Sequence, residues 1–97
     1  MASNIRFVYA EKADLGSAAF TAATMKIGRR YICLHNLHAS QIIYAKFGAT
    51  AESAKGHVVK AGEKLEFGVD RHGFCPVDYL SVYASGSSTG YSLVEGF

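Results

Sequence analysis

Cysteine and histidine side chains are the residues of this sequence whose types and spacing are best suited to chemistry. Cys33, His35 and His38 lie within six residues, and His72 and Cys75 are three apart. Thiolate and imidazole are preferred ligands of tetrahedral zinc, so the two segments could form a zinc site if the fold joined them. Structural zinc sites, however, draw their ligands from paired, closely spaced knuckles, and this spacing is not such a pair. We therefore predict no metal site.

The same cysteines could act as nucleophiles, because a neighbouring imidazole can hold a thiol as thiolate. Cys33 has His35 two residues away, and Cys75 has His72 three residues away. No orienting carboxylate accompanies either pair, and the sequence contains neither a phosphate-binding glycine loop nor His-Glu-x-x-His. We expect two buried or half-buried thiols, reduced because no signal peptide is evident. We predict no enzyme, no catalytic residue and no cofactor.

The elements that position these residues are predicted by period-two hydrophobicity. Runs at 28–36, 41–48, 60–67 and 78–84 alternate apolar and polar residues, and a last strand follows near 91–95. Successive side chains of a strand point to opposite faces, so every second residue of each run is expected in the core. The residues predicted to point inward are Ile32, Leu34, Leu80, Val82 and Ala84. Three further sets each share one face of their run: Ile43, Ala45 and Phe47; Leu65, Phe67 and Val69; and Tyr91, Leu93 and Glu95.

Small and polar residues between these runs predict the turns. Gly62-Glu63 marks a tight turn, and Gly86-Ser87-Ser88-Thr89-Gly90 is expected to close a hairpin between the last two strands. Gly48 ends a run where a close approach or positive φ would require glycine. Asn36 follows a strand and precedes His38-Ala39-Ser40, so its side chain is expected to satisfy backbone groups of that loop.

The first 27 residues carry a weaker signal. Residues 5–9 alternate and are rich in β-formers, which predicts a first strand followed by a polar loop over 11–17. Residues 18–27 are expected to be extended, although their alanines also favour helix. Alternatively, residues 1–17 form an arm that is ordered only against a partner.

The sequence as a whole predicts an all-β fold. We expect a small antiparallel β-sandwich of the jelly-roll or immunoglobulin-like (Ig-like) type over residues 18–97, preceded by an N-terminal strand or extended arm over 1–17.

Composition limits the class of partner. The chain has 97 residues, enough for one domain, with 49% hydrophobic and only 19% charged residues. Such low charge predicts that partners cover much of the surface. The net charge of +2 is dispersed, which argues against nucleic acid, and no apolar run is long enough to span a bilayer. We expect no nucleic-acid or membrane partner and no secretion.

Six tyrosines and six phenylalanines, without tryptophan, are the remaining signal. The tyrosines at outward positions of the predicted strands are Tyr31, Tyr44, Tyr79 and Tyr83. They could form an aromatic stripe that binds a partner, since tyrosine buries a large area and keeps a polar tip. The alternative is that a two-sided sandwich buries some of them in a second small core.

Three motifs occur in order along residues 28–97. They are Gly28-Arg29-Arg30-Tyr31-x-x-Leu34-x-Asn36, Ile43-Tyr44-x-Lys46-Phe47-Gly48 and Ala61-Gly62-Glu63-x-Leu65-x-Phe67, followed by a closing strand and a small-residue hairpin. This combination resembles small β-sandwich virion proteins of tailed bacteriophages, which serve as capsid decoration (cement) proteins or as head–tail and tail components. The sequence departs from the pattern at Ala61, where proline is expected before the turn glycine, and at Cys75-Pro76.

The resemblance implies a non-enzymatic structural protein of the virion, assembled in the host cytoplasm. The first function it implies is a decoration protein that binds and stabilises the lattice of the major capsid protein, as a homo-oligomeric dimer or trimer. A head–tail connector or tail component is one alternative. A carbohydrate-binding module is another, because sandwiches with exposed aromatic residues bind sugars, but it is weakened by the lack of tryptophan.

The residues predicted to bind the partner are Phe7, Tyr9, Arg29, Arg30 and Phe97. Phe7 and Tyr9 would anchor the N-terminal segment. Arg29 and Arg30 begin a strand, where one could pair with a carboxylate of a neighbouring subunit or remain solvated. Phe97 is a large apolar group at the chain end and is expected to pack against another surface.

Overall fold

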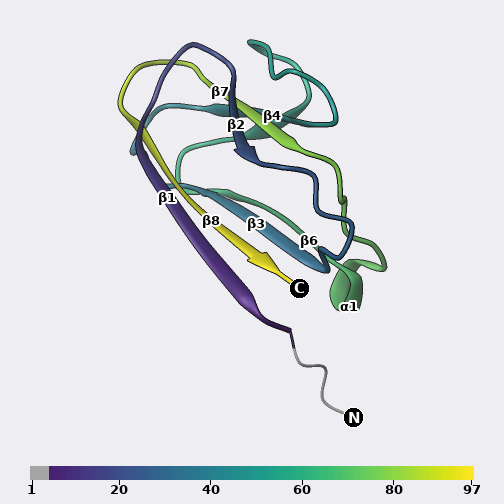
Figure 1. Cartoon of the computed structure of the whole chain (residues 1–97). Helices are drawn as coiled ribbons and strands as arrows, with labels where there is room; N and C mark the ends of the chain where they lie inside the picture. Colours follow the sequence, from purple (N-terminus) through teal and green to yellow (C-terminus); the bar gives the residue numbers. More distant parts are fainter. Residues whose placement is uncertain (1–4) are drawn as a thin grey trace.

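The structure is a computed structural model that describes residues 5–97. Eight strands form two antiparallel sheets, sheet A with the order β1-β8-β3-β6 and sheet B with the order β2-β7-β4-β5 (Figure 1). In chain order the elements are β1 (Phe7–Leu15), β2 (Phe20–Ala23), β3 (Tyr31–Asn36), β4 (Ile43–Phe47), β5 (His57–Val59), β6 (Lys64–Gly68), α1 (Val69–His72), β7 (Leu80–Ala84) and β8 (Thr89–Gly96).

The strands pair in a nested order. Counted from the two ends of the chain, β1 pairs with β8, β2 with β7, β3 with β6 and β4 with β5. This nesting is the arrangement of an eight-stranded jelly roll, in which an antiparallel ribbon is rolled so that its strands lie alternately in two sheets. The predicted all-β sandwich is confirmed, and of its two predicted types the strand order is that of the jelly roll.

The core lies between the sheets and consists mainly of residues that the alternation places inward. Ile32 and Leu34 of sheet A and Ile43 and Ala45 of sheet B belong to one buried cluster. Burial of a side chain the size of leucine or isoleucine contributes about 1.5–3 kcal/mol, so these contacts are the main stabilising term. The cluster is completed by Leu15, Ala23, Val59, Leu80, Val82, Ala84, Tyr91 and Leu93.

Residues Gly86–Gly90, which include the loop after β7 and the start of β8, do not close the hairpin that their composition predicts. β7 lies in sheet B between β2 and β4, whereas β8 lies in sheet A between β1 and β3. The loop therefore crosses from one sheet to the other, and its bend is held where Thr89 Oγ1 donates a hydrogen bond to Gly86 O at 2.9 Å. Turn-forming residues show where a chain reverses, but long-range register decides which strand it then meets.

The N-terminal segment forms the longest strand of the described chain. β1 pairs with β8 from Phe7 opposite Gly96 to Lys12 opposite Tyr91, and a bulge separates Lys12 from Leu15. Of the two predicted alternatives, the structure has the strand, and the polar loop predicted over 11–17 is wrong because β1 continues to Leu15. Residues 1–4 of the predicted arm lie outside the described residues. Both faces of this edge strand are largely exposed, so its alternation is weak.

The predicted extended segment over 18–27 contains β2 and is confirmed there. Two short elements were not predicted from the sequence. β5 has only three residues, and α1 begins at Val69, which the alternation placed in a strand. Both are too short to show a periodic pattern.

Asn36 organises the loop after β3, as predicted. Its Nδ2 donates hydrogen bonds to Gln41 O at 2.8 Å and Val59 O at 2.9 Å, and its Oδ1 accepts one from His38 N at 3.0 Å. The side chain is fully buried. The predicted turn at Gly62 is also present, since Gly62 has φ +76°.

Candidate partner-binding surface

The outer face of sheet A carries a group of aromatic and apolar side chains from three strands. Register places Phe7, Gly96 and Tyr31 in one row across β1, β8 and β3. The next row contains Tyr9, Val94 and Cys33. We call Phe7, Tyr9, Tyr31, Cys33 and Val94 the aromatic face.

Gly96 allows the two rings of the first row to meet. A Cβ at Gly96 would lie 3.0 Å from Tyr31 Cβ and 3.3 Å from Phe7 Cε1, closer than ordinary packing allows. Without it, the Phe7 and Tyr31 rings pack edge to face, with centroids 5.9 Å apart and planes at 87°. This T-shaped geometry is a preferred arrangement of aromatic pairs, so the aromatic face is ordered before any partner binds.

Tyr31 is fixed from its other side by β6. Its hydroxyl donates a short hydrogen bond to the Glu66 carboxylate. Burial, and then this hydrogen bond, raises the pKa of Tyr31, while the same bond lowers the pKa of Glu66. The ring is therefore a neutral, oriented group at neutral pH.

The two thiols do not have the environment of a nucleophile. Burial raises the pKa of Cys33 and also the pKa of Cys75. A reactive cysteine requires the opposite shift, because the thiolate is the attacking species. Both cysteines are free, and Cys75 Sγ donates a weak hydrogen bond to Pro76 O at 3.6 Å.

The residues considered for zinc are not brought together. Within residues 5–97, no three histidine, cysteine or acidic side chains form a group that could hold a metal ion. His38 Nδ1 instead accepts hydrogen bonds from Ser40 N at 3.0 Å and Gln41 N at 2.9 Å. His72 Nδ1 accepts one from Gly68 N at 3.1 Å.

The loop between β7 and β8 matches the letters of the Gly-x-Ser-x-Gly nucleophile motif at Gly86–Gly90. Its central Ser88 has φ +57°, which is uncommon for a residue other than glycine. The motif, however, acts where a strand turns into a helix, so that the serine stands at the helix N-terminus. Here the loop joins two strands of different sheets, so the resemblance is limited to the residue letters.

Arg29 lies inside the protein. It is 2% exposed, and its Nε donates a hydrogen bond to Glu95 Oε2 at 2.8 Å. Lys26 Nζ lies 2.7 Å from the other carboxylate oxygen, Glu95 Oε1. The remaining guanidinium donors reach three loop carbonyls at 2.7–3.0 Å, those of Thr24, Pro76 and Asp78. We call Lys26, Arg29 and Glu95 the ionic cluster.

The ionic cluster overturns the expectation of a solvated strand end at Arg29. Its guanidinium joins the loop before β3, the loop before β7 and the end of β8. A charge this deeply buried is tolerated only when it is paired and fully hydrogen-bonded, as it is here. The sequence signal that could have located it is Glu95, an acidic residue at an inward position of a predicted strand.

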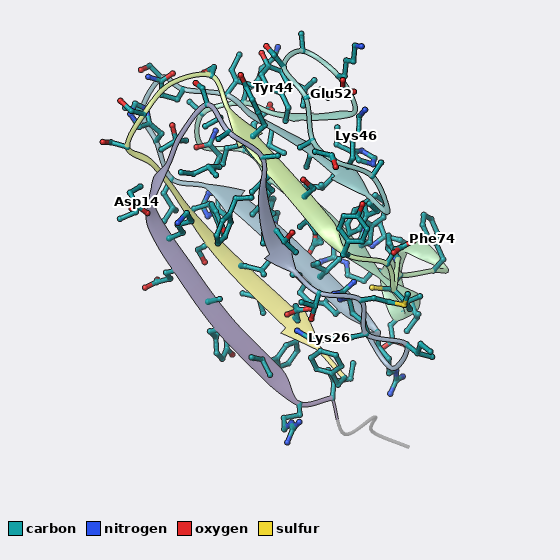
Figure 2. All side chains as sticks on the ribbon, turned by 45° about the horizontal axis from the view of Figure 1, so that its top comes forward. Asp14, Lys26, Tyr44, Lys46, Glu52 and Phe74 are labelled. Carbon is teal, nitrogen blue, oxygen red and sulfur yellow. The ribbon has the colours of Figure 1, made fainter. Side chains whose placement is uncertain are left out.

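Arg30 and Phe97 remain half-exposed. Arg30 lies 3.9 Å from the Asp70 carboxylate, a long ion pair at the surface. Phe97 exchanges backbone hydrogen bonds with Arg6 at 2.8 and 2.9 Å, and Lys26 Nζ lies 5.5 Å from its ring centroid. Figure 2 shows Lys26 at the end of β8, close to the base of β1.

Phe7 and Tyr9 are the most accessible part of the aromatic face. Phe7 is 46% and Tyr9 72% exposed, and Val8 between them is 43% exposed on the opposite face of β1. Sequence reasoning identified Phe7 and Tyr9 but missed Val8 and Val94, because the position of β1 at the edge is set by long-range pairing. Two other phenylalanines are exposed, Phe20 on β2 and Phe74, and Phe74 lies on the side of the molecule away from β1 (Figure 2).

The tyrosines predicted to form one stripe lie on two sheets. Tyr31 projects from sheet A, whereas Tyr44 and Tyr83 are directly opposed on β4 and β7 of sheet B. Tyr79 precedes β7. All four are half-buried, which agrees with neither a single open stripe nor a second closed core.

Similarity to known proteins is visible in the fold. No known family model matches the sequence, and no curated protein is significantly similar to it. A solved subunit of the disulfide-linked pili that form Bacillus endospore appendages superposes with a TM-score of 0.51 at 13% identity, over 96% of this chain and 85% of that one. The two chains share a fold. PirA superposes with a TM-score of 0.42 at 16% identity, over 100% of this chain and 96% of that one.

The arrangement is suited to binding through side chains and backbone of β1. Over residues 5–97 no enclosed pocket is present, and no helix is of a length and apolarity that could cross a bilayer. What the surface offers is ordered aromatic rings beside a long edge strand, and such groups are enriched where proteins contact one another.

Proposed function

We propose that the protein is a non-enzymatic structural protein of a phage virion, and that it acts as a decoration protein which binds the lattice of the major capsid protein through the aromatic face. The observation that carries this proposal is the exposure of Phe7 and Tyr9, at 46% and 72%, beside the ordered Tyr31. Contiguous exposed aromatic groups mark sites of protein contact.

Two further observations support the proposal. The motifs over residues 28–97 resemble those of small phage virion proteins. The jelly roll is a common architecture of viral capsid domains, which is an analogy at the level of the fold alone.

The mechanism would be adhesive. Burial of Phe7, Tyr9 and Tyr31 across a junction between capsid subunits would add apolar contact area that opposes the pressure of packaged DNA. Many weak contacts of this kind act together when the protein is oligomeric, because each bound copy raises the local concentration of the next. Arg30 and Phe97, half-exposed at the same end of β8, would lie at the rim of the contact.

The test is co-sedimentation with capsids that lack the protein. The variant with Phe7→Ser and Tyr9→Ser should lose affinity by about tenfold or more, because exposed aromatic anchors dominate such interfaces. Phe74→Ser removes a ring that is 55% exposed on the other side of the molecule and is the matched control. Equal binding by the double variant and the control would refute the proposal, and densitometry of virions would separate a many-copy decoration protein from a tail component.

A subunit of a filament is the second candidate. The Bacillus protein with the same fold is described as forming disulfide-linked pili. Filaments in electron micrographs of the concentrated protein, together with failure to bind capsids, would favour this function.

A further inference from the structure

Among residues 5–97, no strand pairs with the outer edge of β1. Arg6 and Phe97 exchange both of their backbone hydrogen bonds, at 2.8 and 2.9 Å, and the register continues with Val8 opposite Glu95 and Ala10 opposite Leu93. In an antiparallel ladder, pairs of this kind alternate with pairs whose N–H and C=O groups point away. The N–H and C=O groups of Phe7, Tyr9 and Glu11 therefore point away from β8, towards the free edge of sheet A.

The apolar segment Phe7-Val8-Tyr9-Ala10 of this edge lacks the features that protect an edge strand, and the charged residues Glu11, Lys12 and Asp14 follow it. Natural proteins blunt such edges with short strands, prolines, bulges or charges. β1 has nine residues, and its one bulge follows Lys12, beyond the apolar segment Phe7-Val8-Tyr9-Ala10. Lys12 does not place its charge at the free edge, because its Nζ is held 4.1 Å from the Phe20 ring centroid and 3.1 Å from Asp14 Oδ1.

The other three edges of the sandwich are protected. β5 has three residues, and β2 has four with a register shift after Thr21. β6 carries Lys64 and Glu66, and the N–H of Gly68 at its end is used by His72 Nδ1 at 3.1 Å. In the part of the chain that the structure describes, pairing between copies through sheet edges therefore has one available surface, and a surface that binds its own copy closes about a two-fold axis.

We infer that the free edge of β1 pairs antiparallel with β1 of a second copy of this chain, about a two-fold axis between the two Val8 residues. An axis perpendicular to the sheet keeps the outer face of both copies on one side. Phe7 of one copy is then opposite Tyr9 of the other on that face, and the two Val8 side chains meet on the opposite face. The three large apolar side chains of the segment, Phe7, Val8 and Tyr9, each gain an apolar neighbour, while Ala10 is opposite Arg6. Aromatic cross-strand pairs are favourable.

The opposite face leaves room for this pairing. Val8 is 43% exposed, and the contacts of β1 with the sandwich interior lie further along the strand, where Lys12 Nζ meets the Phe20 ring and Leu15 belongs to the core cluster. The dimer would join the two copies of sheet A into one continuous sheet and double the aromatic face. The inference deepens the proposed function and rests on it for its role, since a paired aromatic face binds a shell with higher avidity.

Disulfide trapping tests the axis. In this register the two Val8 Cα atoms form a non-hydrogen-bonded pair, about 4.5 Å apart, which suits a disulfide. Two Tyr9 residues would be diagonal, about 7–8 Å apart, which does not. Under mild oxidation Val8→Cys should give a covalent dimer and Tyr9→Cys much less, with the wild-type protein, whose Cys33 is buried, as the blank. Equal or no crosslinking of both variants would overturn the inferred register.

Proline substitution tests the edge itself by sedimentation equilibrium of the purified protein. Tyr9→Pro removes an N–H that the monomer does not use, so it should weaken self-association by about tenfold or more without unfolding the chain. Tyr9→Thr keeps that N–H and controls for the lost ring, whereas Ala10→Pro removes a bond to β8 and should destabilise the fold. A wild-type protein that stays monomeric, or a Tyr9→Pro variant that dimerises as well as Tyr9→Thr, would overturn the inference. Capsid binding is measured separately, so either proposal can fail alone.

Discussion

The ionic cluster and the exposed segment of β1 are neighbours with opposite properties. Glu95 and Val8 are directly opposed on β8 and β1, yet Glu95 is 4% and Val8 43% exposed. Around Glu95 every buried side-chain polar atom of the described residues has a hydrogen-bond partner within the chain. One residue away across the ladder, apolar side chains and backbone groups face solvent. β8 is paired on both sides and β1 on one, and this difference is the basis of the proposed partner surface.

The largest loss of stability is expected when a charge of the ionic cluster is removed. Glu95→Ala leaves the Arg29 guanidinium buried without its anion, which should reduce the free energy of unfolding by about 3–5 kcal/mol. Tyr9→Ala, on the exposed side, should change it by about 0.5 kcal/mol or less. Urea unfolding measures both. A Glu95→Ala variant as stable as Tyr9→Ala would contradict the difference drawn between the ionic cluster and the exposed segment of β1.

A second enclosed group, Asn36, should have a somewhat smaller effect. Asn36→Ala leaves the carbonyls of Gln41 and Val59 and the N–H of His38 without their partner, at a cost of about 2–4 kcal/mol. Asn36→Asp keeps the acceptor for His38 and removes both donors, so it separates the two contributions. Stability unchanged in either variant, measured by thermal unfolding, would mean that the loop reorganises around the substitution.

Tyr31 combines the two properties, because its ring lies on the aromatic face and its hydroxyl is hydrogen-bonded within the chain to Glu66. Tyr31→Phe should cost about 1 kcal/mol at neutral pH. The hydrogen bond lowers the pKa of Glu66 below its ordinary value of 4.5, so this stability is present above about pH 4.5 and is lost as pH falls through the folded pKa.

The pH dependence of unfolding, compared between wild type and Tyr31→Phe, measures that contribution. Tyr83→Phe, which removes a hydroxyl from sheet B, is the control. Two parallel curves for wild type and Tyr31→Phe in the acid range would argue against a bond to ionised Glu66.

The smallest change in stability near neutral pH is expected for a substitution of Tyr91, which is buried in the core. Burial raises the pKa of Tyr91 from 10.0 to about 12. The folded state therefore holds this proton more tightly, and the associated stability is complete below pH 10 and is lost as pH rises towards 12. Tyr91→Phe should flatten the alkaline decline in stability, as followed by circular dichroism. An unchanged decline would assign it to other groups.

Local pattern predicted the inner faces of the long strands and failed where pairing partners decide the structure. Ile32, Leu34, Ile43 and Leu80 are inward because a strand alternates, whatever it pairs with. The crossing of the Gly86–Gly90 loop and the continuation of β1 to Leu15 depend on contacts distant in sequence.

The candidate surface was also only partly predictable from the sequence. Phe7 and Tyr9 could be identified as large apolar residues in a first strand that the sequence pattern predicts only weakly. The burial of Arg29 and the exposure of Val8 could not, because both follow from the place of β8 and β1 in sheet A. A sequence shows which side chains alternate but not which strand becomes an edge.

Residue-resolved amide hydrogen exchange of β1, measured over a range of protein concentration, tests the central claim most directly. In the dilute protein, the amides of Val8 and Ala10 should be protected by β8, and those of Phe7, Tyr9 and Glu11 should exchange rapidly. At high concentration, the second group should become protected as well. If the amides of Phe7, Tyr9 and Glu11 exchange rapidly at every concentration, the open edge of β1 is not a site of pairing between copies.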